Sequence, residues 1–177
     1  MSVFNLDDVL DEIEDVAFGE GQVEPVEEDE EEQPPFHEEV ESQSEELISD
    51  LIAHLDGEEM EDLTAALLRA MGFHAQTTQA GADDGVDVEA HPDPLGFEDP
   101  YVKVQVKHRQ STKTSNSDVR DFLGTLGGKE KGLFVSTGGY TRKAEKEPDR
   151  TDKRITLIDR DRFVELLLKH YEDMEPE

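Results

Sequence analysis

Apolar residues in the middle of the chain recur every three or four positions. Between Leu47 and Leu55 this spacing predicts one helix, which ends near Gly57. From Met60 to Met71 the same spacing predicts a second helix, and the glycine that follows is a typical C-terminal stop. The globular part of the chain is therefore expected to open with two helices.

Extended runs follow, with helical patterns between the later ones. Strands are predicted at 73–78, 85–91, 101–107, 132–137 and 155–158, and helices at 119–126, 141–147 and 163–168. Strand–helix–strand units after Tyr101 imply parallel pairing through crossovers, whereas the earlier strands are close enough to pair antiparallel. The expected fold class is α/β, with a mixed central sheet in which an antiparallel hairpin precedes parallel strands and helices flank both.

A hairpin is predicted from strands 85–91 and 101–107, with the loop 92–100 between them. If its turn centres on Gly96, Glu89 lies opposite Lys103 and Asp87 lies opposite Gln105. The pairs on the other face are then all apolar: Val86 with Val106, Val88 with Val104 and Ala90 with Val102. A matched charge pair and an apolar face both favour this register.

This register would bring three chemically useful groups together. Lys107 lies two residues beyond Gln105 and points to the same side, next to Asp87. Carboxylate and amide oxygens suit Mg²⁺, and a metal-bound water is a better nucleophile. The lysine would orient that water or stabilise developing charge, which outlines a site for phosphodiester hydrolysis. The alternative is that these residues form the solvated side of a half-buried sheet.

Charge is distributed unevenly along the 177 residues. Acidic residues number 46 against 17 Lys and Arg, for a formal net charge of −29, and residues 1–60 contain no Lys or Arg. Dense acids indicate either an acidic tail or a halophilic protein adapted to high salt. Apolar spacing predicts an amphipathic helix within 1–18, and the acidic run and paired prolines of 19–44 predict a disordered linker. The alternative for this stretch is an arm that imitates DNA phosphates.

Several classes of protein are not expected. No apolar run approaches about 18 residues, and the first residues carry no basic region, so neither a membrane helix nor a signal peptide is predicted. The absence of cysteine excludes disulfides, thiolate zinc sites and cysteine nucleophiles, and we expect a cytoplasmic protein. Motifs for NTP binding, dinucleotide binding and serine nucleophiles are also missing.

Residues 60–168 contain motifs in a family-like order. These are Met60-Glu61 at the start of a helix, Asp84-Gly-Val-Asp-Val88, Gln105-Val-Lys-His108, Val119-Arg-Asp-Phe-Leu-Gly124, the segment from Gly132 to Ala144 and Ile155-Thr-Leu-Ile-Asp159. This series resembles the catalytic domain of the Mrr-like restriction endonucleases, within the PD-(D/E)xK nuclease superfamily. The resemblance implies a restriction-endonuclease-like core over residues 45–172, followed by a short tail at 173–177.

The resemblance also implies roles for individual residues. Asp87 would be the main metal carboxylate, Gln105 the second metal-side residue and Lys107 the catalytic lysine. Glu61 would supply a helix carboxylate near the metal, and Asp84 a supporting acid. The implied cofactor is Mg²⁺ or Mn²⁺. The sequence departs from the family at Met60, where an aromatic residue is expected before the helix glutamate.

Double-stranded DNA is the expected partner, and no membrane is expected. The residues predicted to contact DNA are Lys103, His108, Arg109, Lys113, Arg120, Tyr140 and Arg142. The expected function is a type IV, Mg²⁺-dependent endonuclease in restriction of foreign or modified DNA. The alternatives are a repair or junction-cleaving nuclease, and a non-catalytic DNA- or partner-binding protein regulated by the acidic N-terminus. Target recognition would come from a homodimer or from a partner protein.

Overall fold

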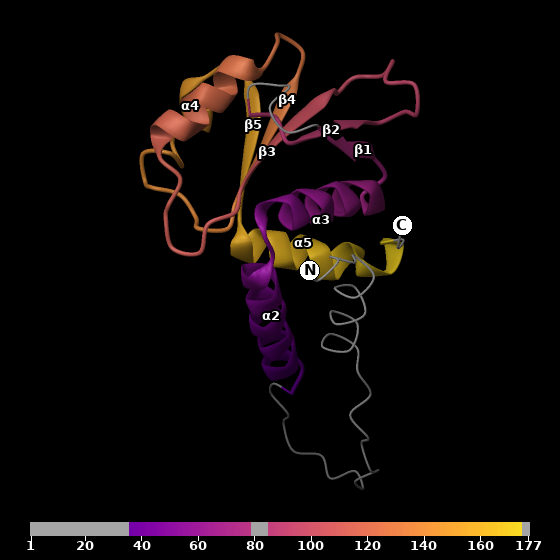
Figure 1. Ribbon diagram of the computed structural model, residues 1–177, viewed down its shortest axis with the longest axis vertical. Coiled ribbons are helices and arrows are strands. Elements are labelled where there is room, and N and C mark those ends of the chain that lie inside the picture. The colour runs from indigo at the N-terminus through magenta and orange to yellow at the C-terminus, as the bar shows by residue number, and fades with distance from the viewer. Residues whose placement is uncertain (1–35, 79–84, 175–177) are drawn as a thin grey trace, which may run out of the picture.

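The computed structural model describes residues 36–78 and 85–174, with side chains from residue 45 onward (Figure 1). The helix predicted within 1–18 and most of the predicted linker lie outside these residues. The first described helix, α2, spans Phe36–His54 and so begins within the range 19–44 that was predicted to be a disordered linker. Among the described residues, no helix is long and apolar enough to cross a membrane.

The predicted helices and strands mostly form, with shifts of a few residues at their ends. The helices after α2 are α3 (Gly57–Ala70), α4 (Asn116–Thr125) and α5 (Arg160–His170). The strands are β1 (His74–Thr77), β2 (Val88–His91), β3 (Val102–Lys107), β4 (Lys131–Ser136) and β5 (Arg154–Asp159). Short 3-10 helices lie at Pro148–Arg150 and Tyr171–Asp173.

The five strands form one mixed sheet in the order β1-β2-β3-β4-β5. The pairs β1–β2 and β2–β3 are antiparallel, and the pairs β3–β4 and β4–β5 are parallel. The expected fold class, a hairpin followed by parallel strands with helices on both faces, is therefore confirmed. Helix α4 lies on one side of the sheet, and α3 and α5 lie on the other (Figure 1).

Each face of the sheet has its own hydrophobic core. On one face, Val88 and Val104 are fully buried against α3 and α5, whose Leu63 and Phe163 are also buried. On the other face, the α4 residues Val119 and Phe122 pack around Phe134, and the two phenylalanine rings meet edge to face at 5.4 Å. The alternation along β2 to β4 separates these two cores, as the period of a strand requires.

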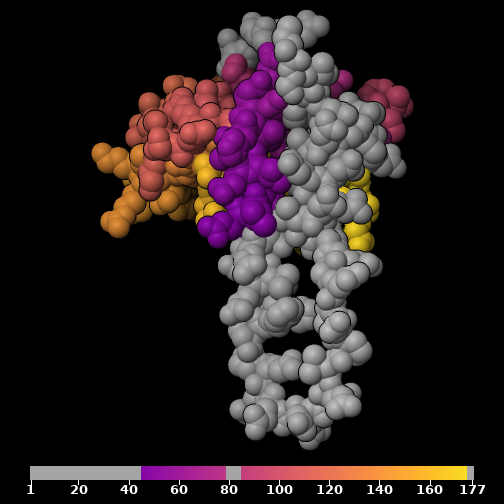
Figure 2. Space-filling view, turned by 60° about the horizontal axis from the view of Figure 1, so that its bottom comes forward, coloured from indigo at the N-terminus to yellow at the C-terminus, as the bar shows by residue number. Residues whose placement is uncertain are grey.

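One predicted helix does not form. Residues 141–147 make a turn rather than a helix, and a 3-10 helix begins at Pro148. The Glu145 amide donates to the Thr141 carbonyl at 3.1 Å, an i→i+4 bond, whereas the Glu147 amide reaches back only three residues, to the Ala144 carbonyl. Pro148 has no amide hydrogen to continue such a ladder, so the segment 137–153 between β4 and β5 contains turns and a short 3-10 helix instead of an α-helix. In Figure 2 this segment and α4, coloured orange and salmon, stand out to one side of indigo α2.

Candidate active site where strands β2 and β3 separate

The predicted hairpin register is confirmed from Val88 to Ala90. The paired residues are Val88 with Val104, Glu89 with Lys103 and Ala90 with Val102. Before Val88 the pairing changes, so the apolar pair expected between Val86 and Val106 does not form. Val86 instead joins the core around α4, on the opposite face from Val88. The physical reason is a turn at Gly85, whose φ is +89°.

Asp87 lies at this break and uses its side chain as part of the strand pairing. Its amide donates to the Val104 carbonyl at 2.8 Å. The Val106 amide donates to Oδ2 of Asp87 at 2.6 Å. The carboxylate therefore takes the place that a strand carbonyl would take in a regular ladder. Asp87 brackets the backbone of Gln105 from both sides.

Gln105 is buried beside the Gly85 turn, with 8% of its surface exposed. A Cβ atom added to Gly85 would lie 2.6 Å from Nε2 of Gln105. No side chain other than hydrogen fits at Gly85 without moving the amide. The backbone thus approaches Gln105 closely because residue 85 is glycine, and the glycine also accommodates the positive φ.

Glu61 reaches the same place from α3. The helix is anchored at its start by a capping box, in which Asp56 accepts from the Glu59 amide at 3.0 Å and Glu59 accepts from the Asp56 amide at 2.6 Å. Glu61 follows two residues later, beside the fully buried Met60. Burial, followed by the charge of Asp87, raises the pKa of Glu61 to about 7.

Asp87 also has a raised pKa, and burial is its main cause. The bond from the Val106 amide and the charge of Lys107 act in the opposite direction. Two carboxylates and one ammonium group are therefore in electrostatic contact at this end of the hairpin. The structure brings Glu61, Asp87 and Lys107 together, with Gln105 between the strands.

The donor set of this site fits a hard divalent cation. The described residues contain no group of three His, Cys, Asp or Glu side chains placed to hold a metal. Mg²⁺ usually binds through one or two carboxylates and keeps several waters. Glu61 and Asp87 supply two such carboxylates, and Gln105 adds an amide oxygen. A cation would offset the burial and the repulsion from Asp87 that raise the pKa of Glu61. Asp84, the predicted supporting acid, lies outside the described residues.

Two of the predicted DNA contacts are already engaged within the protein. Lys103 Nζ lies 3.2 Å from a carboxylate oxygen of Glu130 and 3.4 Å from the Thr125 carbonyl at the end of α4. The two ring nitrogens of His108 lie 2.8 Å from the Leu55 carbonyl and 3.1 Å from Thr137 Oγ1. Both side chains therefore hold separate parts of the fold together. The sequence alone did not indicate this structural role.

Two further predicted contacts are similarly occupied. Arg120 forms a two-pronged ion pair with Glu147, with both distances at 2.9 Å. Tyr140 is buried, and its hydroxyl donates toward the carbonyls of Phe134 and Ile158 at 2.6 and 3.0 Å. The expectation of a DNA contact does not fit the burial of Tyr140, whose ring completes the core around α4.

The other three predicted contacts are at least partly exposed. Lys113 and Arg142 are exposed, and Arg109 is half-buried. The charges of Arg109 and Lys107 both act on Asp118 at the start of α4, whose pKa is lowered mainly by its hydrogen bonds with Ser115. These three cations therefore remain the available basic side chains of the predicted set, beside Lys107.

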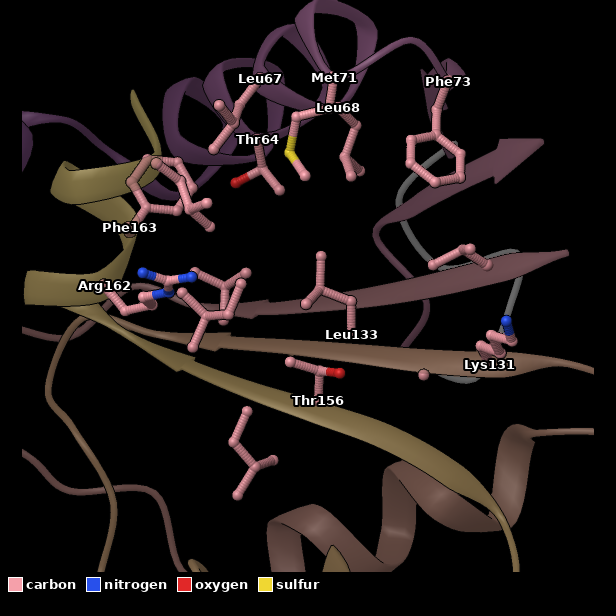
Figure 3. Close-up of a pocket in the computed structure, with 16 residues that line it drawn as sticks. Thr64, Leu67, Leu68, Met71, Phe73, Lys131, Leu133, Thr156, Arg162 and Phe163 are labelled. Atoms are coloured by element: carbon pink, nitrogen blue, oxygen red, sulfur yellow. The ribbon is translucent and has the colours of Figure 1, made fainter. Parts of the chain in front are cut away.

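A separate hollow of about 360 Å³ lies between α3, α5 and the sheet (Figure 3). Its walls are mainly apolar, with Leu67 and Leu68 above Leu133 in the view shown. None of the predicted site residues lines it. The hollow offers apolar contacts but none of the groups that hydrolysis requires.

Comparison with known proteins identifies the family. A restriction endonuclease family model, the Mrr catalytic domain, matches residues 52–167. The chain therefore belongs to the Mrr-like restriction endonuclease family, as its motifs suggested. No protein of curated function matches it at a significant level.

Two solved structures share the fold. The restriction endonuclease MspJI, in complex with a 27-mer oligonucleotide, has a TM-score of 0.54 and 18% identity, covering 86% of this chain and 36% of its own. The DNA modification-dependent restriction endonuclease AspBHI has a TM-score of 0.58 and 17% identity, covering 71% of this chain and 35% of its own. The chain thus matches about a third of the length of each of these enzymes.

Sequence reasoning missed two features of the site. It placed Gly85 at the start of a strand and within a motif, although the adjacent Asp-Gly pair is a known indicator of a turn. It also missed that the Asp87 carboxylate binds the Val106 amide. No spacing rule anticipates the second feature, because it depends on where the two strands separate.

Proposed function

We propose that this protein is a Mg²⁺- or Mn²⁺-dependent endonuclease that hydrolyses phosphodiester bonds of double-stranded DNA, in restriction of foreign or modified DNA. The observation that carries this proposal is the convergence of Glu61, Asp87 and Lys107 at the break between β2 and β3. Membership of the Mrr-like family supports it. So does the fold shared with a modification-dependent restriction endonuclease.

The residues have distinct roles in this proposal. Glu61, Asp87 and the Gln105 amide oxygen hold the cation. The bound cation supplies Lewis-acid chemistry, which activates water and neutralises charge on a phosphate. The charge of Lys107 acts on Asp87, and its ammonium group would orient the attacking water and stabilise charge that develops on the phosphate.

The exposed cations near this site position the DNA. Lys113, Arg142 and the half-buried Arg109 would contact phosphates, which fixes register without reading sequence. Recognition of a target or a modified base would come from a second copy or from a partner protein.

Plasmid cleavage tests the proposal. Supercoiled plasmid, with and without base modification, is incubated with the full chain and Mg²⁺ or Mn²⁺ at low and molar KCl. The wild type should cut only when a metal is present. Asp87→Ala and Lys107→Ala should each reduce the rate by about 10³-fold or more. Cutting that persists in both variants, or that needs no metal, would contradict the proposal.

A further inference from the structure

The segment that follows β3 is attached to the corner between α2 and α3 through one imidazole ring. His108 Nε2 lies 2.8 Å from the carbonyl of Leu55. A carbonyl oxygen only accepts, so Nε2 carries the hydrogen and donates. Leu55 directly follows the last residue of α2, and carbonyls at a helix end lack a donor within the helix. His108 provides that donor from a residue far along the chain.

The two sides of this bond lead directly to the two halves of the candidate site. On one side, His108 follows Lys107, the last residue of β3. On the other, Leu55 precedes Asp56, the N-cap residue from which α3 begins. Glu61 lies in the second turn of that helix. The imidazole therefore links the strand that carries Gln105 and Lys107 to the start of the helix that carries Glu61.

Thr137 fixes the same segment from the end of β4. Its hydroxyl lies 3.1 Å from Nδ1 of His108, and it accepts the Arg109 amide at 2.9 Å. Its own amide donates to the Lys107 carbonyl at 3.2 Å. The ring of His108 is therefore held on both nitrogens, and the backbone on each side of it is held by the same threonine.

We propose that His108 is a positioning residue, which sets the α3 carboxylate against the β3 side chains by bridging Leu55 and Thr137. This inference rests on the proposed function and names a residue that controls the geometry of the same site. It replaces the expected DNA contact of His108, whose two ring nitrogens face the protein. Losing an outer partner of a metal site typically costs about 10–100-fold in metal affinity or activity.

A pair of amide substitutions separates this role from simple packing. His108→Gln can still extend an N–H donor toward the Leu55 carbonyl, whereas His108→Asn carries the same amide on a chain one methylene shorter. Gln110→Ala is the control, because Gln110 donates to Ala53 at the same helix end at 3.1 Å but is exposed and lies further from Lys107. Thermal unfolding of each variant checks that the fold is retained.

Two measurements on the full chain are compared: Mn²⁺ affinity by electron paramagnetic resonance, and the single-turnover rate of plasmid cleavage at saturating Mn²⁺. We expect His108→Asn to weaken Mn²⁺ binding about tenfold, with His108→Gln closer to wild type and Gln110→Ala unchanged. The proposal is overturned if His108→Asn binds Mn²⁺ and cleaves like Gln110→Ala, or if His108→Gln is no better than His108→Asn. A wild type that binds Mn²⁺ without cutting DNA would contradict the proposed function alone, since the affinity comparison would still decide the role of His108.

Discussion

Two aspartates mark the two ends of the β2–β3 pair, and they differ in their hydrogen-bond partners and in the direction of their pKa shifts. At the open end, Asp87 is partly buried, receives one backbone amide and has a raised pKa. At the loop end, Asp93 is also partly buried, but it receives the amides of Leu95, Phe97 and Glu98 at 3.1, 3.0 and 2.9 Å. These bonds lower the pKa of Asp93.

The contrast separates a carboxylate that shapes the fold from one available to a ligand. The charge of Asp93 is satisfied by amides of its own loop, so it organises the turn and needs no cation. The charge of Asp87 acts on a second carboxylate, Glu61, and the charge of one lysine, Lys107, acts to lower the pKa of Asp87. Residues of one type thus acquire different roles from the number and kind of their partners.

The largest expected effect comes from removing each aspartate in turn. Asp87→Ala should lower metal-dependent plasmid cleavage by about 10³-fold or more, because it removes a cation ligand. Asp93→Ala should leave the cleavage rate unchanged and lower Tm, because it frees three loop amides. Rates and unfolding curves measured on both variants check this. Equal losses of cleavage in the two variants would contradict the claim that Asp87 serves the cation while Asp93 serves only the loop.

The next largest effect concerns the two glycines of this hairpin that have positive φ. Gly85→Ala should cost about 1–3 kcal/mol of stability from the backbone alone and also lower cleavage, because its Cβ would meet Gln105 at 2.6 Å. Gly96→Ala has a similar φ of +68° but would meet the His91 ring at 3.2 Å, so it should cost stability without lowering cleavage per folded molecule. A normal cleavage rate for Gly85→Ala would show that the approach to Gln105 does not matter.

The pH dependence of stability should also have opposite signs at the two ends: the Glu61 contribution is lost as pH rises, and the Asp93 contribution is lost as pH falls. The folded pKa of Glu61 is raised to about 7, so its contribution is most favourable below about pH 4.5 and is lost as pH rises through 7. Without metal, Glu61→Gln should therefore stabilise the protein at pH 8, by about 1 kcal/mol after allowance for solvent screening.

Asp93 has a lowered pKa, so its stabilisation is present at neutral pH and is lost as pH falls below its ordinary value. Asp93→Asn should destabilise the protein at pH 8 and have less effect in acid. Chemical denaturation of the two variants from pH 2.5 to pH 8 compares them. A destabilised Glu61→Gln at pH 8 would contradict the repulsion inferred between Glu61 and Asp87.

The smallest expected effect concerns DNA affinity at the two ends. Lys113→Ala should weaken binding to all sequences alike and reduce the salt slope by about 1, because it removes one phosphate contact. Lys129, which is exposed and pairs with Asp99 near the loop end at 3.6 Å, is the matched control. Binding isotherms over a range of KCl concentrations, with Ca²⁺ in place of Mg²⁺, measure both. If Lys129→Ala and not Lys113→Ala reduced the salt dependence of DNA affinity, the DNA would contact the loop end of the hairpin, which would contradict the account.

The regular part of this hairpin could be predicted because its side chains alternate strictly. The pairing of Glu89 with Lys103 followed from charge, and that of Val88 with Val104 from burial. The break at Gly85 could not be predicted in the same way, because alternation was assumed to continue to Val86. The structure shows Val86 in the opposite core, and this change of face is what frees the Asp87 carboxylate.

Basic residues were the least predictable part of the site. Residue type alone does not distinguish Lys113, which is exposed, from Arg120, which pairs with a carboxylate more than twenty positions away. Burial of Tyr140 likewise depends on distant elements, because its hydroxyl binds carbonyls of β4 and β5 and its ring joins the core around α4. Whether such a side chain is exposed or engaged within the fold depends on partners far away in the sequence, which a local sequence pattern does not reveal.

The central claim is that Glu61 and Asp87 together hold a divalent cation. Calorimetric titration of Mn²⁺ at pH 7, in two buffers of different ionisation enthalpy, measures both binding and the protons released. The account predicts saturable binding with release of part of a proton per ion, since the pKa of Glu61 is about 7, and loss of that binding in Asp87→Ala. No binding by the wild type, or the same affinity in Asp87→Ala, would contradict it.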